Sequence, residues 1–419
     1  MSEYTLFQRQ KEIEPKLMAG SVCVNWDMRL GKTRAVLHAF NRLTFQGGPR
    51  TLVVICPSIA KGVWQAEQAD MGLDLPTTVL DGITKKRAAG LTFAGLPRMI
   101  ICNWEIADAH LPELQELFDK ERVVLVLDET HDHCCNPRNA RYKAVRDLAM
   151  MADRVWELTG TLYRTSAMDL HWQLRLLGPS HYPFYYMKTQ AFGEKFAYPR
   201  YNQFNKSYEY KGIKPGTEAE LINLPVIDRR LEEMTELPEE IPWWLDEGDK
   251  YKYEGGEQEG AMSKARSELS NLKAQRTIEL VRRNNLHLKP LVIFGWHKNF
   301  IHKVAAELGA AIIDGDVPHE QKTRICRDFA EHRIGIIVAN IQAAGKSVDL
   351  ATAQHAVFGE IDWVKATMAQ AEARIRGPKQ TKRPCYWYLL AMNSVDEFVW
   401  RTMLARGRDM KRLDAAKTA

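Results

Sequence analysis

Two short segments of this 419-residue chain combine residue types that could bind and cleave a phosphate anhydride. The first reads Asn25-Trp-Asp-Met-Arg-Leu-Gly-Lys-Thr33 and stands between a strand-like run and a helix-like pattern. Gly31 would let the backbone approach a phosphate group, and the first N–H groups of the helix would face the anion. Lys32 would neutralise the β- and γ-phosphates of ATP, and the hydroxyl of Thr33 would bind Mg²⁺. Taken alone, Gly-Lys-Thr is equally compatible with an ordinary surface loop.

The second segment is an apolar run, Val123–Leu127, that ends in two carboxylates. Asp128 would bind Mg²⁺ through water, and Glu129 would orient or deprotonate the water that attacks the γ-phosphate. The pair follows Thr33 by about 95 residues, a separation that leaves room for further strands of one parallel sheet. Together the two segments predict an ATPase site. The adjoining cluster His131-Asp-His-Cys-Cys135 is spaced too tightly for a typical zinc site, so we interpret it as the loop after the carboxylates.

Alternating strand-like and helix-like patterns must position these residues. Continuous apolar runs of four to eight residues are typical of parallel strands that are buried on both faces. We therefore predict an α/β protein with two doubly wound parallel-sheet lobes, at 1–178 and 265–419, and a helical or irregular insertion and linker at 179–264. The strand candidates are Val22–Asn25, Thr51–Cys56, Met99–Asn103, Val123–Leu127, Val155–Leu158, Leu291–Phe294, Ala311–Ile313, Ile334–Ala339, His355–Phe358 and Cys385–Leu390, and the helix candidates are Lys32–Leu43, Leu111–Lys120, Ser263–Asn284 and Gln321–Glu331.

Composition limits the class of protein. Hydrophobic residues make up 45% and charged residues 26%, and the net charge of +5 permits a polyanionic partner without requiring one. No apolar run approaches the roughly 20 residues that span a bilayer, and the polar N-terminus does not resemble a signal peptide. Seven dispersed cysteines indicate reduced thiols. We expect a soluble, cytoplasmic protein without a membrane partner. Nothing in the sequence specifies an oligomeric state, and a monomer is compatible with it.

The motifs resemble those of superfamily II helicases. Asp128-Glu-Thr-His131 resembles the Asp-Glu-Ala-His box, with threonine in place of alanine. The other motifs recur in family order over about residues 4–404, and Glu360-Ile-Asp-Trp363 is most similar to the branch-migrating, strand-annealing ATPases of the SWI/SNF-related branch. The remaining matches are Leu6–Gln10 to the upstream glutamine motif, Val54–Trp64 to motif Ia, Leu158–Thr161 to motif III, Tyr210–Pro238 to the pre-linker block, Leu291–His297 to motif IV, Ala343–Leu350 to motif V and Gln370–Arg376 to motif VI.

This resemblance implies two RecA-like lobes and assigns roles to individual residues. Arg374 would reach the γ-phosphate from the second lobe. Gly377 stands where the family has its second arginine, so Arg376 is either the substitute or a bystander. Nucleotide contacts would come from Gln10, Arg29, Gly31, Lys32, Thr33 and Gly345, coupling of hydrolysis to movement from Thr159, Gly160 and Thr161, and nucleic-acid contacts from Pro57, Ser58, Trp64, Asn103, Trp104, His297, Gln342 and Trp363.

The implied function is that of an ATP-dependent DNA helicase or translocase. It would use ATP and Mg²⁺ to move on or remodel duplex, forked or branched DNA, and the length matches that of minimal bacterial or phage motors. Backbone contacts would make the motor largely independent of DNA sequence. One alternative is an RNA-dependent ATPase of the same superfamily. Another is a non-catalytic, nucleotide-gated nucleic-acid-binding subunit, because Trp26, Leu162, Ser347 and Gly377 depart from the family pattern.

Overall fold

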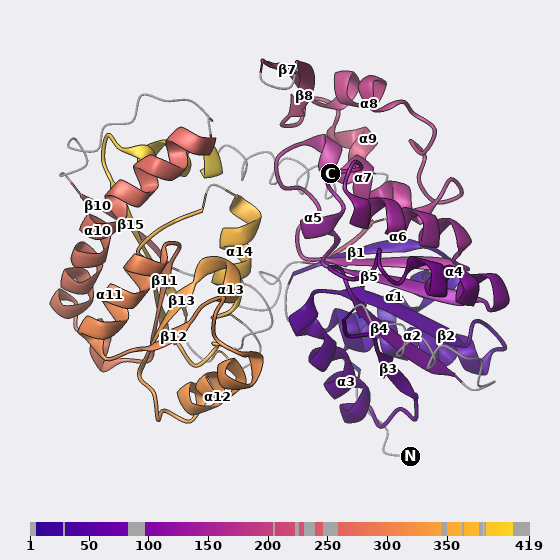
Figure 1. Cartoon of the computed structure of the whole chain (residues 1–419), viewed down its shortest axis with the longest axis horizontal. Helices are drawn as coiled ribbons and strands as arrows, with labels where there is room; N and C mark the ends of the chain where they lie inside the picture. Colours follow the sequence, from indigo (N-terminus) through magenta and orange to yellow (C-terminus); the bar gives the residue numbers. More distant parts are fainter. Residues whose placement is uncertain are drawn as a thin grey trace. The chain divides into compact units, whose positions relative to one another are not determined.

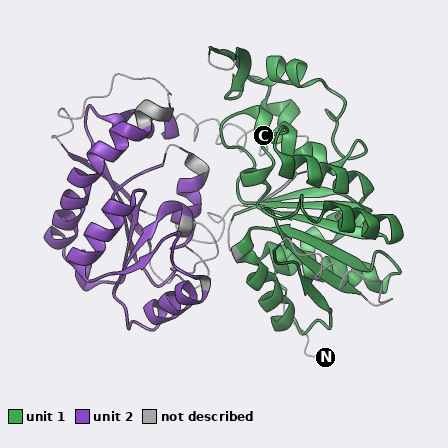
Figure 2. Ribbon diagram, in the orientation of Figure 1, with its two compact units in different colours: residues 1–230, 409–419 green, residues 231–408 purple. Residues whose placement is uncertain are grey.

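A computed structural model describes residues 6–27, 30–82, 97–203, 206–222, 226–229, 239–245, 259–344, 350–362, 364–376, 380 and 383–404 of the protein. The chain divides into two compact units (Figure 2). Unit 1 comprises residues 1–230 and 409–419, and unit 2 comprises residues 231–408. Each unit is built around a parallel sheet of its own, which confirms the predicted fold class of two α/β lobes.

The sheet of unit 1 has seven strands within the described residues, in the order β3-β4-β2-β5-β6-β1-β9. Every neighbouring pair in it is parallel. The runs of valine, isoleucine and leucine at its centre are buried, as expected for strands without a solvent face. The strands are β1 (Val22–Trp26), β2 (Thr51–Cys56), β3 (Thr77–Val79), β4 (Arg98–Asn103), β5 (Val123–Asp128), β6 (Arg154–Thr159) and β9 (Val226–Arg229).

Helices connect these strands in the alternating pattern of an α/β unit (Figure 1). Trp156 on β6 ties the sheet to the first helix, because its indole N–H donates to the carbonyls of Leu17 and Gly20, each at 3.1 Å. The helices are α1 (Gln8–Ala19), α2 (Lys32–Phe45), α3 (Lys61–Asp70), α4 (Leu111–Lys120), α5 (Thr130–His133), α6 (Ala140–Met151), α7 (Ala167–Leu174), α8 (Thr189–Phe196) and α9 (Glu218–Ile222), with 3₁₀ turns η1 (Ser58–Ala60) and η3 (Arg175–Leu177).

Among its described residues, unit 2 has a six-stranded parallel sheet in the order β10-β15-β14-β11-β13-β12. Its core is organised by Phe294, Phe358 and Tyr388, whose rings stack in series at centroid distances of 4.8 and 4.9 Å. The strands are β10 (Glu239–Leu245), β11 (Leu291–Gly295), β12 (Ala311–Ile313), β13 (Ile336–Asn340), β14 (His355–Phe358) and β15 (Cys385–Ala391), and the helices are α10 (Glu259–Arg283), α11 (Lys298–Leu308), α12 (His319–Ala330), α13 (Ile341–Ala344) and α14 (Lys365–Ala373), with the 3₁₀ turn η6 (Leu286–Leu288).

All ten strands expected from apolar runs are present, with ends shifted by at most two residues. Five further strands were not expected: β3, β9, β10 and the antiparallel hairpin of β7 (Tyr198–Asn202) and β8 (Ser207–Lys211). The segment 179–264, interpreted from the sequence as insertion and linker, therefore contributes β9 to the first sheet and β10 to the second. Both lie at the edge of their sheet, where a strand needs less apolar sequence.

None of the seven cysteines, all of which lie in described parts of the chain, takes part in a disulfide bond. Among the described helices, none is long and apolar enough to span a bilayer.

One buried ion pair should dominate the electrostatic stability of unit 2. Lys273 on α10 donates from Nζ to Asp396 Oδ2 at 2.6 Å, and both side chains are buried. Replacing Lys273 with methionine leaves a buried carboxylate without its cation, which should lower the free energy of unfolding by about 3–5 kcal/mol. The matched change Lys264→Met on the same helix breaks an exposed pair with Glu268 and should cost at most about 1 kcal/mol. Urea denaturation of both variants checks this, and equal losses would contradict it.

Candidate functional site

The predicted site residues of unit 1 gather at one edge of its sheet. Strands β2, β5, β6 and β1 are consecutive and parallel, so their carboxyl ends meet at the same edge. Trp26 ends β1, Asp128 ends β5 and Thr159 ends β6. In open α/β sheets this edge is where ligands bind.

The phosphate-loop candidate adopts a backbone suited to its predicted role. Gly31 has φ +82°, a left-handed conformation that side chains disfavour, and it caps the N-terminus of α2. Lys32 opens that helix and donates from Nζ to the carbonyls of Trp26 at 2.8 Å and Asp27 at 3.4 Å. The ammonium group is thus held over the loop at the helix N-terminus, where an anion would bind. Trp26 still belongs to β1 and its indole is buried, so its departure from glycine is accommodated in the core.

Two residues of helix α1 form hydrogen bonds with this loop. Gln10 is buried, its Nε2 donates to the carbonyl of Gly31 at 3.1 Å, and its Oε1 accepts from the backbone N–H of Phe7 at 2.9 Å. A side chain at position 31 would meet Gln10 Nε2 at 2.2 Å, so the loop also needs glycine for close approach. Arg9, which the sequence did not single out, donates from Nε to the carbonyl of Leu30 at 3.0 Å. Gln10 therefore shapes the phosphate loop here, and its predicted contact with the nucleotide stays a prediction.

Asp128 lies buried between two tryptophan indoles. Trp64 on α3 donates from Nε1 to the Asp128 carboxylate at 3.2 Å, and Trp104 after β4 donates to the Asp128 carbonyl at 2.9 Å. Burial first, and then the carboxylate of Glu129, raise the pKa of Asp128 from 3.8 to about 7. Lys32 and the Trp64 indole act in the opposite direction and lower it. The carboxylate therefore lies close to the Lys32 ammonium, in a place where it lacks a full counter-charge.

These contacts correct part of the predicted nucleic-acid surface. Trp64 and Trp104 are both 0% exposed, so neither indole can contact a nucleic acid in this structure. They position the carboxylate instead, a role that the sequence did not suggest. Asn103 is also buried and donates from Nδ2 to Glu105 at 2.7 Å. Pro57 is buried and Ser58 is exposed at the start of η1, so Ser58 alone of this group faces solvent.

Glu129 is held in an unusual backbone conformation beside a histidine. Its φ is +56°, a left-handed value that costs energy for a residue other than glycine and is typical of functional positions. The buried His131 places Nδ1 3.4 Å from Glu129 Oε2 and 2.9 Å from Thr159 Oγ1. Thr159 Oγ1 also accepts from the backbone N–H of Thr161 at 3.1 Å. One imidazole thus joins the acidic box to the predicted coupling loop.

Further bonds brace this loop. Arg164 donates from Nη1 to the carbonyl of His131 at 3.0 Å. Asp169 on α7 accepts backbone N–H bonds from Arg164, Thr165 and Ser166 at 3.1, 2.6 and 3.1 Å. Ser166 and Asp169 form a capping box, a signature that can be read from the sequence. The contact of Arg164 with the box joins segments 33 residues apart and could not be read in this way.

The cluster after the box makes separate contacts. The ring of His133 stacks on Trp104 at 4.8 Å, Cys134 is buried, and Cys135 donates from Sγ to the carbonyl of His131 at 3.1 Å. Nothing in this arrangement points its side chains toward one ligand.

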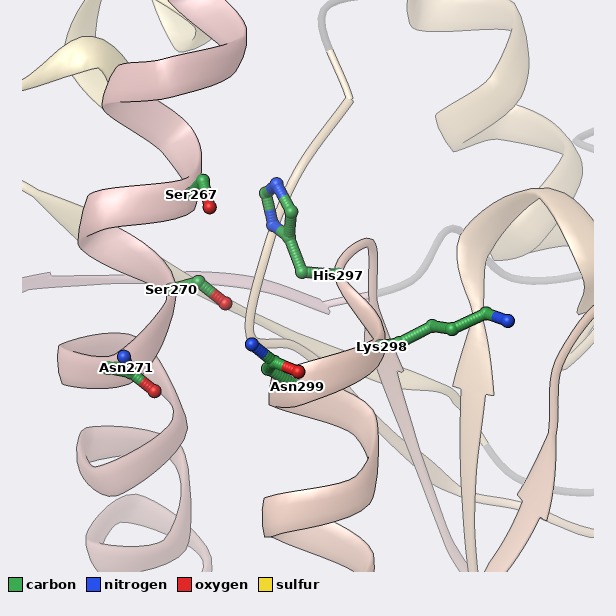
Figure 3. A pocket seen from close by; sticks show the side chains of 6 residues that line it. All are labelled: Ser267, Ser270, Asn271, His297, Lys298 and Asn299. Atoms are coloured by element: carbon green, nitrogen blue, oxygen red, sulfur yellow. The ribbon is translucent and has the colours of Figure 1, made fainter.

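In unit 2, His297 lines a polar pocket of about 170 Å³ between α10 and the start of α11 (Figure 3). Glu360 fixes this edge, because its carboxylate accepts from the N–H of Trp296 at 2.7 Å and of His297 at 2.9 Å and contacts His297 Nδ1 at 2.7 Å. Burial raises the pKa of Glu360, but the hydrogen bond and charge of His297 outweigh it and hold that pKa below its usual value. The lining residues are Ser267, Ser270, Asn271, His297, Lys298 and Asn299.

The other predicted residues of unit 2 are dispersed. Gln342 is exposed on α13, and Arg374 is buried directly after α14, where its carbonyl accepts from Leu350 N–H at 3.2 Å. Arg376 is half-buried. Arg29, Gly345 and Trp363 lie outside the described residues, so their predicted roles stay predictions.

The residues of unit 1 fit a hard divalent cation with a nucleotide. The Thr33 hydroxyl and the Asp128 carboxylate are oxygen ligands of the kind that Mg²⁺ prefers. A buried carboxylate with a raised pKa is under-compensated, and a bound cation would relieve this. These two residues would hold the ion.

Comparison with known proteins agrees with this arrangement. Residues 272–376 match the family model of the helicase conserved C-terminal domain. The chain is 24% identical over 404 residues to the SWI/SNF-related matrix-associated actin-dependent regulator of chromatin subfamily A-like protein 1 of Xenopus tropicalis, covering 89% of this chain and 41% of that protein. It is 22% identical over 415 residues to the DNA annealing helicase and endonuclease ZRANB3 of Mus musculus, covering 91% and 38%.

Over most of its length the chain is similar to proteins of the SWI/SNF-related branch of the superfamily II helicases. It spans about two fifths of the length of these two relatives. A search of solved structures finds the Sulfolobus solfataricus SWI2/SNF2 ATPase core in complex with dsDNA, with a TM-score of 0.48, 18% identity and coverage of 95% of this chain and 90% of that one.

The buried Asp128 carboxylate should destabilise the fold of unit 1. Because folding raises the pKa of Asp128 from 3.8 to about 7, the folded state loses stability as pH rises through this interval, and the cost is constant above it. Asp128→Asn keeps an acceptor for Trp64 but cannot ionise. In metal-free buffer at pH 8 we expect the variant to be more stable by ~1–3 kcal/mol.

Urea denaturation between pH 5 and pH 8 checks this. The advantage of Asp128→Asn should shrink as the pH falls, since the wild-type carboxyl is then protonated in the folded state. An advantage that does not change with pH, or a variant less stable than wild type at pH 8, would contradict the assignment.

Proposed function

We propose that the chain is a nucleic-acid-dependent ATPase that acts as a DNA translocase or helicase. The observation that carries this is the meeting of Lys32, Asp128 and Glu129 at one sheet edge, with His131 joining Glu129 to Thr159. ATP hydrolysis requires a cation for the phosphates and the two carboxylates. A motor also requires a contact such as that of His131, through which hydrolysis can change the structure outside the nucleotide site.

In the proposed mechanism, phosphate binds at the N-terminus of α2. The first N–H groups of the helix face the anion, and Lys32 turns from the carbonyls of Trp26 and Asp27 to the β- and γ-phosphates. Thr33 and Asp128 would hold Mg²⁺, which would supply positive charge against the phosphates. Glu129 accepts the proton of the attacking water. Its strained backbone and the nearby His131 keep this carboxylate facing one direction.

Hydrolysis can reach the coupling loop through His131. When Glu129 takes up a proton its charge is lost, and the attraction of the imidazole toward it weakens. The same imidazole nitrogen is bonded to Thr159, which shapes the turn to Thr161. We propose that the weaker attraction between His131 and Glu129 lets the loop Thr159–Thr161 move. From unit 2, Arg374 would stabilise charge on the γ-phosphate, and Arg376 is proposed as its partner.

DNA is the proposed polymer because both relatives named above carry DNA-related or chromatin-related names, one of them DNA annealing helicase. Ser58 in unit 1 and the pocket around His297 in unit 2 are proposed as backbone contacts. The pocket offers hydroxyl, amide and imidazole groups, which can donate to phosphate oxygens, and Lys298 extends from its rim toward Asp316 (Figure 3). Helix α11 starts there and adds the positive end of its dipole. Forked and branched DNA are the proposed substrates, and an RNA-driven motor is the alternative.

The central test is steady-state ATP hydrolysis without polymer and with single-stranded, duplex or forked DNA or with RNA. We expect stimulation by DNA that is greatest for forked or duplex forms. Glu129→Gln should bind ATP but lose about 10²–10⁴-fold in the stimulated rate, since it cannot accept the proton. Stimulation by RNA alone would move the chain to the RNA branch. Rates that no polymer changes would leave a nucleotide-binding scaffold.

The pocket can be tested through Lys298, whose side chain is exposed at its rim. Lys298→Ala should raise the DNA concentration for half-maximal stimulation severalfold and reduce the dependence of log affinity on log salt concentration by about one unit. Lys303 is an exposed lysine on the same helix and outside the pocket, so Lys303→Ala is the matched control. Identical behaviour of the two variants would contradict a phosphate contact in the pocket.

A further inference from the structure

The proposed mechanism does not use the side chains of the β7–β8 hairpin. The hairpin lies beside α8, apart from the seven-stranded sheet (Figure 1). Its register pairs Tyr198 with Lys211, Arg200 with Glu209 and Tyr201 with Tyr208. Because side chains alternate between faces, Tyr201, Tyr208 and Tyr210 lie on the same face.

The base of the hairpin is firmly mounted. The ring of Tyr210 packs so closely on α8 that a side chain at Gly193 would meet it at 2.6 Å. Lys214 N–H donates to the carbonyl of Phe196 at 2.8 Å, which closes the chain onto the end of the same helix. The buried rings of Phe192 and Phe196 lie 4.5 Å apart beneath it. Tyr210 therefore anchors the hairpin to α8.

The same base is bonded to the coupling region. Gly212, the residue after β8, donates to the carbonyl of Thr165 at 3.0 Å and accepts from the N–H of Ala167 at 3.1 Å. Thr165 follows Arg164, which is bonded to His131 of the acidic box. The base of the hairpin is therefore bonded to the segment that directly follows the coupling loop Thr159–Thr161.

The outer part of the same face carries aromatic rings without a protein cover. Tyr201 is 52% exposed and Tyr208 is 64% exposed, and their rings meet edge-on at a centroid distance of 5.4 Å. Single exposed aromatics are common and need no explanation. Two that are paired across strands on an anchored hairpin form a rigid surface, and rigid aromatic surfaces lose little entropy when a flat ring stacks on them.

The charge around these rings suits a polyanion. Between residues 198 and 211 there are three basic side chains and one acidic, a net charge of +2. The acidic one, Glu209, accepts from Asn202 Nδ2 at 2.6 Å and lies 3.6 Å from Lys211 Nζ, so its charge is answered within the hairpin. Lys206 is exposed two residues before Tyr208, whereas Arg200 is opposite Glu209 on the other face of the hairpin. Aromatic rings flanked by basic residues are the combination that binds single-stranded nucleic acids.

We propose that Tyr201 and Tyr208 form a stacking site for unpaired nucleobases, with Lys206 contacting an adjoining phosphate. This inference rests on the proposed function, which it deepens by naming single-stranded nucleic acid, such as one arm of a fork, as the ligand of unit 1. Stacking does not depend on base identity, because every base has a flat π face.

Binding of single strands that contain 2-aminopurine tests the site, since stacking on tyrosine quenches the fluorescence of this base. We expect Tyr201→Ala/Tyr208→Ala to lose about tenfold or more in affinity and most of the quenching. Tyr201→Phe/Tyr208→Phe should retain both. Tyr186→Ala is the matched control, because this tyrosine is 82% exposed in the same segment but outside the hairpin, and it should behave as wild type. All these rings are at the surface, so thermal unfolding curves should be unchanged.

The result that overturns the proposal is wild-type affinity and quenching in the double alanine variant, or an equal loss in Tyr186→Ala. Parallel titrations with single-stranded DNA and RNA identify the polymer, and a loss specific to the hairpin on either supports the site. The proposed function fails separately, when no polymer stimulates ATP hydrolysis by the wild type. If duplex DNA stimulates hydrolysis equally in wild type and double alanine variant while single-strand affinity is also unchanged, the hairpin proposal fails and the motor stands.

Discussion

The arrangement of unit 1 depends on keeping a carboxylate at the buried end of a central strand. Asp128 loses hydration there, and the compensation comes from one indole N–H at 3.2 Å and the nearby Lys32 ammonium. That compensation is incomplete, because the pKa is raised to about 7. A full positive charge beside Asp128 would stabilise the fold, but it would also occupy the position of a bound cation. The rigid indoles of Trp64 and Trp104 hold the group still without neutralising it, which is what a site for a transient ligand requires.

The central strands could be predicted closely because a strand buried on both faces needs a continuous apolar run, and such runs end where the burial ends. The same logic explains the strands that were missed. β10 reads Glu-Glu-Ile-Pro-Trp-Trp-Leu and pairs on one side only, with β15, so its polar residues are tolerated. The hairpin Tyr198–Lys211 has no aliphatic residues in its strands and is held by Tyr210, Gly193 and backbone bonds to α7 and α8. Contacts of this kind depend on tertiary packing, which a local pattern does not contain.

In the site, residues that act through the local backbone were predictable and those that act across the fold were not. Gly31, Lys32, Asp128 and Glu129 sit at strand and helix ends, which the sequence marks by its change of period. Arg9, His131 and Arg164 act on partners 21 to 33 residues away. Their importance follows only from the sheet order that brings β6 between β5 and β1. His131 could be assigned to the box by resemblance, but its hydrogen bond to Thr159 could be identified only from the structure.

The aromatic residues show why residue type alone misplaces a binding surface. The resemblance assigns nucleic-acid contacts to Trp64 and Trp104, yet both are fully buried and their N–H groups donate to Asp128. The exposed pair Tyr201 and Tyr208 lies outside the matched motifs, on a hairpin whose acidic residue Glu209 is bonded within the hairpin. With a net charge of only +5, long-range attraction to a polyanion is modest, so affinity must come from local groups. A polar pocket suits the sugar–phosphate backbone and a tyrosine pair suits bases. A motor that grips the backbone in one place and an unpaired base in another can distinguish a fork from a plain duplex without reading its sequence.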